Sequence, residues 1–524
     1  MNQEMKADIV IIGGSSGGCA AALAAAKMGK TVIMTEETDW IGGQLTSQGV
    51  PPDEHPWIEQ FGCTQSYRQF RNRVREYYRR NFPLTTEASA SLFLNPGNGN
   101  VSRICHEPRA ALAVIHEMLA PYVHSGQVKI FTNYLPEKAE VNGDTVLSVQ
   151  VKNSVTGTRM TLTGTYFLDG TECGDLLPLA NVEYVTGSES QKETGEPHAL
   201  AGEADPLDMQ AITHCFAMDY VEGEDHTIPK PENYEFWRNY QASFWPNKHF
   251  SWTVPHHITL EPRHFTLFPE TNLPSWWLYR RIIDKENFAP GTFVSDTTLV
   301  NWPQNDYWLG PVFEVCEEER QKHLQGAKQL SLSLLYWMQT EAPRPNGKQG
   351  YPGLRLRKDL FGTEDGLAKY PYIRESRRIK AEFTVLEQHV CPDARGEDSS
   401  EIFFDSVGIG SYRIDLHPST GNRNYIDISS YPFQIPLGSL IPIRVKNLLP
   451  ACKNLGVTHI TNGCYRLHPV EWNIGESAGY LAAYCIDGNM EPRAVRNNRE
   501  TLEDFQKLIA QHGIEIQWPR LRSL

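Results

Sequence analysis

The sequence predicts an α/β protein in which a unit with a parallel sheet is built from both ends of the chain and an α+β region is inserted between them. Three observations predict this arrangement. A strand, a glycine turn, a helix and a second strand open the chain, a further strand runs into a turn of small and acidic residues at 165–175, and a helix of small residues follows at 475–485. Between 188 and 431 the glycine-turn patterns stop. The predicted units are residues 1–187, 188–431, 432–490 and a docking helix with its tail at 491–524.

The first 36 residues have the pattern of a nucleotide-binding fold. Residues 8–12 read DIVII, an apolar run typical of a strand buried on both faces of a parallel sheet. GGSSGG follows at 13–18, then an Ala-rich helix, then a strand that ends at Glu36. In such a unit the glycines let the backbone approach a pyrophosphate, the helix N-terminus presents free N–H groups, and the acidic residue accepts ribose hydroxyls. The pattern favours dinucleotide binding over a purely structural turn, although Ser15 stands where GxGxxG has its second glycine.

Two later stretches extend this unit. The strand at 165–168 runs into the turn at 169–175, where a second loop of backbone is expected to approach the same nucleotide. The helix at 475–485 opens with Gly475, and its N-terminus is expected to stabilise negative charge on a bound group.

Together these stretches resemble the family of FAD-dependent oxidoreductases whose nucleotide-binding halves lie at both ends of the chain. The matching pieces cover most of the chain: GGSSGG with Glu36, DWIGGQLTSQG, FLDGTECGDL, PYIRESRRI and the THI…R…GESAG segment. The resemblance implies FAD as the cofactor, a Rossmann-like FAD-binding domain formed by 1–187 and 432–490, and a substrate domain at 188–431. The family's DATGxGD segment reads DGTECGD here, so Gly170 and Glu172 depart from it.

The cofactor-binding residues that the motifs and the resemblance imply are Gly13, Gly14, Ser15, Ser16, Gly18, Glu36, Gly42, Gly43, Gln44, Thr46, Asp169, Gly170, Gly475, Glu476, Ala478 and Gly479.

The resemblance also implies that Thr458, His459 and Arg466 line the reactive face. A flavin accepts a hydride, and the protein must orient the donor carbon and remove a proton from its heteroatom. Our hypothesis is that His459 is the base, that Arg466 anchors an anionic or polar group, and that His468 or Glu471 completes the polar wall. The alternative is that these side chains only bind the flavin or one another.

No metal site is predicted, because no carboxylate or helical spacing fixes a ligand geometry for the histidines at 249, 256, 257 and 264. Eight of the twelve tryptophans fall between Trp237 and Trp337, where they build a core or stack on a sugar or heteroaromatic ring. The charges of RESRR at 374–378 are expected to form ion pairs. The last helix is expected to be capped by Thr501 and to end at Gly513.

The expected function is that of a dehydrogenase or oxidase that takes a hydride from a small polar, sugar-like or cyclic alcohol or amine and passes electrons to oxygen or a diffusible acceptor. The alternatives are a flavin-dependent monooxygenase, an NAD-dependent dehydrogenase, and, from another class, a carbohydrate-binding or lyase protein.

Composition restricts partners and location. The net charge is −14, which argues against a nucleic-acid partner. Ten cysteines form no CxxC pair, as expected for reduced thiols. The first strand begins near Asp8, which leaves no room for a secretory signal, and no uncharged apolar run reaches membrane-spanning length. We therefore expect a cytoplasmic protein without a membrane partner, and the sequence leaves its oligomeric state open.

Overall fold

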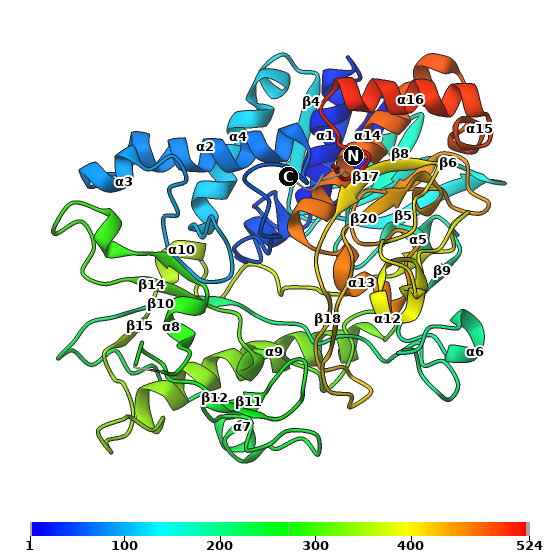
Figure 1. Ribbon diagram of the computed structural model, residues 1–524. Coiled ribbons are helices and arrows are strands. Elements are labelled where there is room, and N and C mark those ends of the chain that lie inside the picture. The colour runs from blue at the N-terminus through cyan, green and yellow to red at the C-terminus, as the bar shows by residue number, and fades with distance from the viewer. Residues whose placement is uncertain (1–2, 271, 520–524) are drawn as a thin grey trace, which may run out of the picture.

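The computed structural model describes residues 3–270 and 272–519 of the chain. The outermost residues of the first and last predicted units, 1–2 and 520–524, lie outside the described residues. Figure 1 shows two halves, an upper half that holds the parallel sheet with its helices and a lower half that holds most of the chain between 216 and 356.

A five-stranded parallel sheet is the centre of the upper half. Its strand order is β21-β8-β2-β3-β4, and every neighbouring pair is parallel. The strands are β21 (Leu448–Pro450), β8 (Tyr166–Asp169), β2 (Ile9–Ile12), β3 (Val32–Glu36) and β4 (Val128–Thr132). A strand from the C-terminal part therefore completes a sheet begun by the N-terminal part, which confirms the predicted fold class.

Helices α1 (Ser16–Lys27) and α14 (His468–Gly488) pack closely on each other beside this sheet. The contact needs glycine, because a Cβ on Gly475 would overlap the backbone of Gly17. The prediction that the C-terminal helix begins at Gly475 is wrong, since α14 begins at His468 and carries a proline in its first turn. Gly475 is a glycine because two helix backbones meet there, and it does not start the helix.

Gly475→Ala is expected to destabilise the protein by about 1–3 kcal/mol, because an added methyl group overpacks the contact between α1 and α14. The loss outweighs the gain that alanine brings in helix propensity. Urea unfolding followed by circular dichroism measures it. Gly202→Ala is the matched control, because nothing lies within 4 Å of its added Cβ. Equal stability of the two variants would contradict the close packing.

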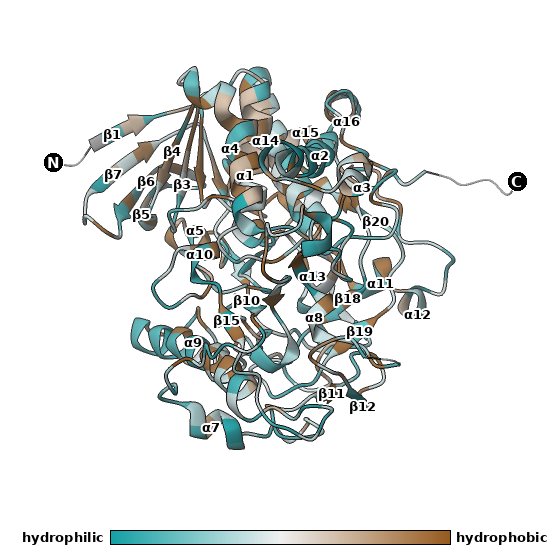
Figure 2. Cartoon of the chain, turned by 90° about the vertical axis from the view of Figure 1, so that its left-hand side faces the viewer, coloured by the Kyte–Doolittle hydropathy of each residue, from teal (hydrophilic) through white to brown (hydrophobic). Residues whose placement is uncertain are grey.

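Two further sheets lie beside this core. Strands β1 (Gln3–Lys6), β7 (Arg159–Thr163), β6 (Thr145–Asn153) and β5 (Tyr134–Asn142) form a mixed sheet at one side of the upper half (Figure 2). In the lower half, β13 (Arg281–Ile283), β14 (Thr297–Val300), β10 (Phe216–Tyr220) and β15 (Leu354–Leu356) form an antiparallel sheet.

Helix α9 (Glu317–Thr340) belongs to the hydrophobic cluster of the lower half. All eight tryptophans between Trp237 and Trp337 are buried in this one cluster, so most of their surface serves core packing. The domain boundaries stay predictions. One of them, at residue 431, lies between two strands that pair with each other, β17 (Ser406–Gly410) and β20 (Phe433–Pro436).

The C-terminal helix α16 (Arg499–Gln511) docks through buried Leu502, Phe505 and Ile509. Its N-cap is Asn498, whose side chain accepts a hydrogen bond from the Thr501 N–H, so the predicted Thr501 cap is wrong. Asparagine is as good a cap as threonine, and it stands three residues earlier. Within the described part of the chain, no helix has the length and apolarity that crossing a bilayer requires.

The remaining elements are α2 (Gln65–Asn81), α3 (Thr86–Ala90), α4 (Pro108–His124), α5 (Leu176–Leu179), α6 (Gln191–Thr194), α7 (Tyr234–Asn239), α8 (Trp276–Tyr279), α10 (Lys358–Phe361), α11 (Glu387–Val390), α12 (Pro392–Arg395), α13 (His459–Tyr465), α15 (Pro492–Asn497), β9 (Tyr184–Val185), β11 (Thr253–Pro255), β12 (Pro262–His264), β16 (Arg378–Ile379), β18 (Ile414–Leu416) and β19 (Ile426–Ile428).

Candidate functional site

The glycine loop between β2 and α1 brings the predicted nucleotide residues together. Gly13 has φ +94°, and a Cβ there would overlap the backbone of Gly170, so the loop needs glycine. The Gly14 N–H donates to Glu36 Oε2 at 2.9 Å. Ser15 caps α1 with its side chain. Burial raises the pKa of Glu36 to about 7. The first helix thus starts beside a fixed carboxylate, as a dinucleotide fold requires.

The segment 42–46 continues from this loop toward the C-terminal half. The Gly42 N–H donates to Gly14 O at 2.7 Å, and Gly42 has φ +107°. Thr46 donates its hydroxyl to Ile41 O at 2.6 Å, so this side chain stabilises the turn itself. Gln44 Nε2 donates to Arg466 O at 3.2 Å. The segment therefore links the nucleotide loop to the residues that follow α13.

Asp169 organises the second loop. Its carboxylate accepts hydrogen bonds from the Thr171 N–H at 2.9 Å, the Thr171 hydroxyl at 2.7 Å and the Leu176 N–H at 3.2 Å. Burial raises the pKa of Asp169 to about 7. The Gly170 N–H donates to Ile12 O at 2.7 Å, which fixes this loop against the first one.

A buried ionic cluster lies at the N-terminus of α1. Lys453, whose side chain is 1% exposed, pairs with Glu172 and lies 3.3 Å from Glu471. Ser16 donates its hydroxyl to Glu471 Oε1 at 2.5 Å. Burial favours the neutral amine, but the surrounding acidic groups hold the pKa of Lys453 well above its usual range. Glu471 therefore faces α1 and Lys453, where it serves as a counter-charge.

This cluster has the ligand types of a metal site. Glu172, Cys452 and Glu471 offer atoms within 4.8 Å of one another. The Lys453 ammonium contacts both carboxylates and the Cys452 sulfur, at 3.3 Å from the last. An internal cation thus already neutralises the cluster.

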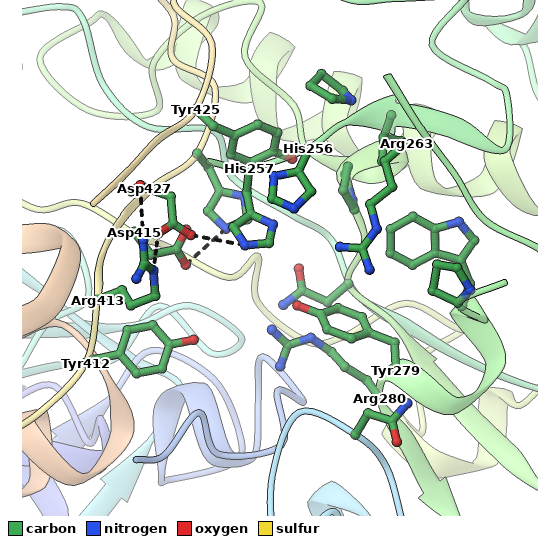
Figure 3. Close-up of a pocket in the computed structure, with 18 of the residues that line it drawn as sticks. His256, His257, Arg263, Tyr279, Arg280, Tyr412, Arg413, Asp415, Tyr425 and Asp427 are labelled. Carbon is green, nitrogen blue, oxygen red and sulfur yellow. Dashed lines mark hydrogen bonds and ion pairs between the residues drawn. The ribbon is translucent and has the colours of Figure 1, made fainter. Parts of the chain in front are cut away.

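A pocket of 630 Å³ lies next to the strands β18 and β19 (Figure 3). It is lined by the β11–β12 hairpin, the end of α8, residues 54–57 and the strands β18 and β19. Its volume falls in the range of about 300–1,000 Å³ typical of small-molecule sites. Its lining mixes aromatic rings with charged side chains.

An aspartate–histidine pair stands in the wall of this pocket. His417 Nδ1 lies 2.6 Å from Asp306 Oδ2, and His417 Nε2 lies 3.7 Å from Asp415 Oδ2. Burial alone would raise the pKa of Asp306, but Arg374 at 2.9 Å and His417 outweigh it and lower the pKa. The ionised Asp306 orients the imidazole by one nitrogen, and the other nitrogen faces the Asp415 carboxylate, so any proton transfer by His417 has Asp415 as its neighbour in the pocket.

The sequence analysis missed both Asp306 and His417. One local signal was available, because Asp415 lies in β18 and His417 directly follows that strand, so two titratable side chains stand two residues apart. Asp306 lies 111 positions away from His417, and no sequence spacing indicates that contact.

Two predicted catalytic residues lie just beneath the pocket. Arg466 donates to Tyr372 OH at 3.0 Å and to Asp415 O at 2.9 Å. His468 Nδ1 accepts from the Asp53 N–H at 3.0 Å, and burial lowers the pKa of His468 to about 4. Arg466 thus joins the cofactor segment, through Gln44, to the pocket carboxylate Asp415.

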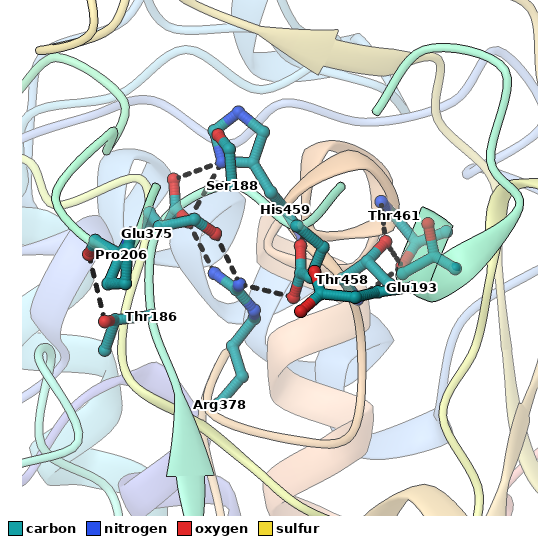
Figure 4. Close-up of polar contacts among 12 residues, drawn as sticks. Thr186, Ser188, Glu193, Pro206, Glu375, Arg378, Thr458, His459 and Thr461 are labelled. Carbon is teal, nitrogen blue, oxygen red and sulfur yellow. Dashed lines mark hydrogen bonds and ion pairs between the residues drawn. The ribbon is translucent and has the colours of Figure 1, made fainter. Parts of the chain in front are cut away.

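His459 lies elsewhere, in an ion-pair network at the start of α13 (Figure 4). Its Nδ1 lies 2.9 Å from Glu375 Oε2, and Arg423 donates to its Nε2 at 2.9 Å. Burial would raise the pKa of Glu375, but His459 and Arg378 bring it down to about 2. Both ring nitrogens of His459 are engaged, and the residue does not line the pocket. The base role assigned to it stays a prediction.

The charges at 374–378 form ion pairs, as predicted. Arg374 pairs with Asp306, Arg378 pairs with Glu375 at 2.5 Å and with Glu189 at 2.8 Å, and Arg377 pairs with Asp175 at 2.9 Å.

The C-terminal cofactor residues lie inside α14. Gly475 and Gly479 face α1, Glu476 accepts from Ser66 of α2 at 2.7 Å, and Ala478 is buried.

The donor set between the two nucleotide-binding parts fits a flavin dinucleotide. Gln44 and Arg466, which are hydrogen-bonded to each other, each keep one buried polar atom without a hydrogen-bond partner among the described residues, namely Gln44 Oε1 and Arg466 Nε. Unpaired buried polar atoms are costly, and the polar edge of a flavin offers partners for them. A small cavity of 20 Å³ lies beside Gly13 and Glu36.

Comparison with known proteins identifies the family. The family model described as FAD dependent oxidoreductase matches residues 8–509. No curated protein matches the chain.

Solved structures give weaker similarities. L-proline dehydrogenase from P. horikoshii is 14% identical over 36% of this chain and 25% of its own, with a TM-score of 0.19, so the chain spans a quarter of that protein. A geranylgeranyl bacteriochlorophyll reductase-like protein from Thermoplasma acidophilum is 10% identical over 98% of this chain and 85% of its own (TM-score 0.33). E. coli quinol fumarate reductase is 10% identical over 97% and 74% (TM-score 0.34). These TM-scores are too low to support a conclusion about substrate or reaction.

Proposed function

Because the chain belongs to the FAD dependent oxidoreductase family, we propose that it oxidises a small polar alcohol or amine held in the 630 Å³ pocket. FAD, when bound, supplies the hydride acceptor. The observation that carries the proposal is the Asp306–His417 pair beside the pocket, at 2.6 Å. A carboxylate-oriented imidazole is suited to take the proton of a substrate hydroxyl or ammonium as the hydride leaves the adjacent carbon.

Residues from both ends of the chain would hold the cofactor. We assign the pyrophosphate to the loop of Gly13, Gly14 and Ser15 with the start of α1, and the ribose hydroxyls to Glu36. Residues 42–46 and Gly170 would border the rest of the dinucleotide. Residues 1–187 and 432–490 then form the FAD-binding domain, and residues 188–431 form the substrate domain.

Arg466 would connect the two sites. Its backbone carbonyl accepts a hydrogen bond from the Gln44 amide, and its guanidinium donates hydrogen bonds to Tyr372 and Asp415. Burial would raise the pKa of Asp415, but His417 and Arg466 outweigh burial and lower it, so Asp415 is an ionised acceptor for a substrate hydroxyl or ammonium. We propose that Arg466 positions Asp415 and that His459 stabilises the Glu375 network.

The electron acceptor would be oxygen or a diffusible compound. The test is an anaerobic screen in which FAD-loaded protein is mixed with alcohols and amines and the visible absorbance of the flavin is followed. At least one alcohol or amine is expected to bleach the flavin and to yield the matching carbonyl or imine product. If dithionite reduces the bound flavin and no alcohol or amine does, the proposal is wrong.

A further inference from the structure

We propose that the pocket selects an anionic substrate, a hydroxylated ring that bears a carboxylate, and that Arg263 binds this carboxylate. The inference rests on the proposed function for the reaction, but the binding preference can be tested without it.

Arg263 has a side chain without a counter-charge. It lies in β12 of the hairpin and is half-buried, with its guanidinium 5.0 Å from the ring centre of Phe265. Figure 3 shows this guanidinium directed into the pocket, toward Tyr279. No described residue forms an ion pair or a hydrogen bond with it. The other two lining arginines are paired, Arg280 with Asp53 at 3.2 Å and Arg413 with Asp427.

The end of the pocket around Arg263 carries one fixed positive charge, that guanidinium, beside two imidazoles. His256 and His257 stack on each other with ring centres 4.6 Å apart. Burial, together with the neighbouring His257 and Arg263, lowers the pKa of His256, while Asp427 acts weakly in the opposite direction. A planar guanidinium that points into a cavity and has no protein partner is suited to bind a carboxylate with two parallel hydrogen bonds.

The opposite wall suits hydroxyl groups. Asp415 is ionised, and Asp427 lies on the same lining. These carboxylates accept hydrogen bonds from hydroxyls, but they repel a doubly charged phosphate, for which the described lining offers one guanidinium without a counter-charge. The ligand that satisfies both walls therefore carries one carboxylate and several hydroxyls.

Aromatic faces favour a ring as the carrier of these groups. Tyr279 and Tyr412 line the pocket (Figure 3), and Trp57 stands at its rim with 40% of its surface exposed. Trp57 is held by Phe61, stacked at 6.3 Å, and by Trp518 at 6.1 Å. Such flat apolar faces with polar tips pack well on the C–H face of a sugar ring. A pocket of 630 Å³ also leaves room for a second ring toward Trp57.

The test compares two pairs of probes that differ only in the carboxylate, D-glucuronate against D-glucose and D-galacturonate against D-galactose. Titration calorimetry on the purified full-length protein measures binding whether or not the flavin reacts. At least one uronate is expected to bind tenfold or more tightly than its neutral partner. Arg263→Gln is expected to reduce that preference to less than twofold, while Arg263→Lys keeps part of it. Arg499→Gln is the control, because Arg499 is 92% exposed and pairs only with Glu503.

The proposal is overturned if neither uronate binds more tightly than its neutral partner, or if the preference survives in Arg263→Gln. The same samples, mixed anaerobically, test the reaction separately. Uronate binding without flavin reduction would count against that sugar as the reducing substrate and leave the anion site intact. Flavin reduction by neutral alcohols without a preference for the uronates would support the proposed oxidation and overturn the anion site.

Discussion

His417→Asn is expected to slow reduction of the bound FAD by substrate about 10²–10⁴-fold, the usual contribution of a positioned general base. Asparagine keeps a side-chain amide that can donate to Asp306, which His417 Nδ1 contacts at 2.6 Å. The substitution removes the second nitrogen, which lies beside Asp415. FAD content and thermal stability are therefore expected to stay close to those of the wild type, while the single-turnover rate falls.

Stopped-flow mixing without oxygen measures this rate, and substrate titration separates binding from the chemical step. His264→Asn is the matched control, because His264 lies outside the lining of this pocket and contacts Thr253. Its rate is expected to stay near that of the wild type. A His417→Asn rate within a few-fold of the wild type would remove His417 from proton transfer, and His459→Asn then becomes the variant to measure.

Lys453→Met is expected to lower the free energy of unfolding by about 3–5 kcal/mol, because it leaves the carboxylates of Glu172 and Glu471 buried without their cation. The Lys453 and Glu471 side chains are 1% and 0% exposed, so solvent does not replace the lost charge. Methionine keeps much of the side-chain volume of lysine, so the loss of stability reports the removal of the positive charge.

Chemical unfolding of the variant and the wild type at neutral pH tests this expectation. Lys507→Met removes a lysine from the exposed pair with Asp504, where 67% and 56% of the side chains are accessible, and is expected to cost less than about 1 kcal/mol. If Lys453→Met were no less stable than Lys507→Met, Glu172 and Glu471 would not depend on Lys453 for their charge balance.

Local patterns predicted the nucleotide-binding part well. The strand at residues 9–12, the loop at 13–15, α1 and the strand ending at Glu36 follow one another without interruption, so their order in the chain is also their order in space. The hydrogen bond from Gly14 to Glu36 joins residues 22 positions apart within that one unit. Helix ends were less predictable, since α14 begins at His468 and Gly475 is reserved for the contact with α1.

The pocket could not be predicted in the same way. Asp306, Arg374 and His417 come from three separate stretches of the inserted part, and their contacts form only when these stretches fold together. The motif around His459 suggested a catalytic role, but it gave no indication that the ring contacts Glu375 and Arg423. Polar residues whose partners are distant in sequence carry no periodic signal, and folding decides whether they meet substrate or one another.

The most direct test of the central claim is the visible absorption spectrum of the purified protein, repeated on the supernatant after acid precipitation. The account expects a flavin spectrum, and chromatography of the supernatant is expected to give close to one FAD per chain. A colourless protein that binds no FAD when unfolded and refolded in its presence would contradict the account.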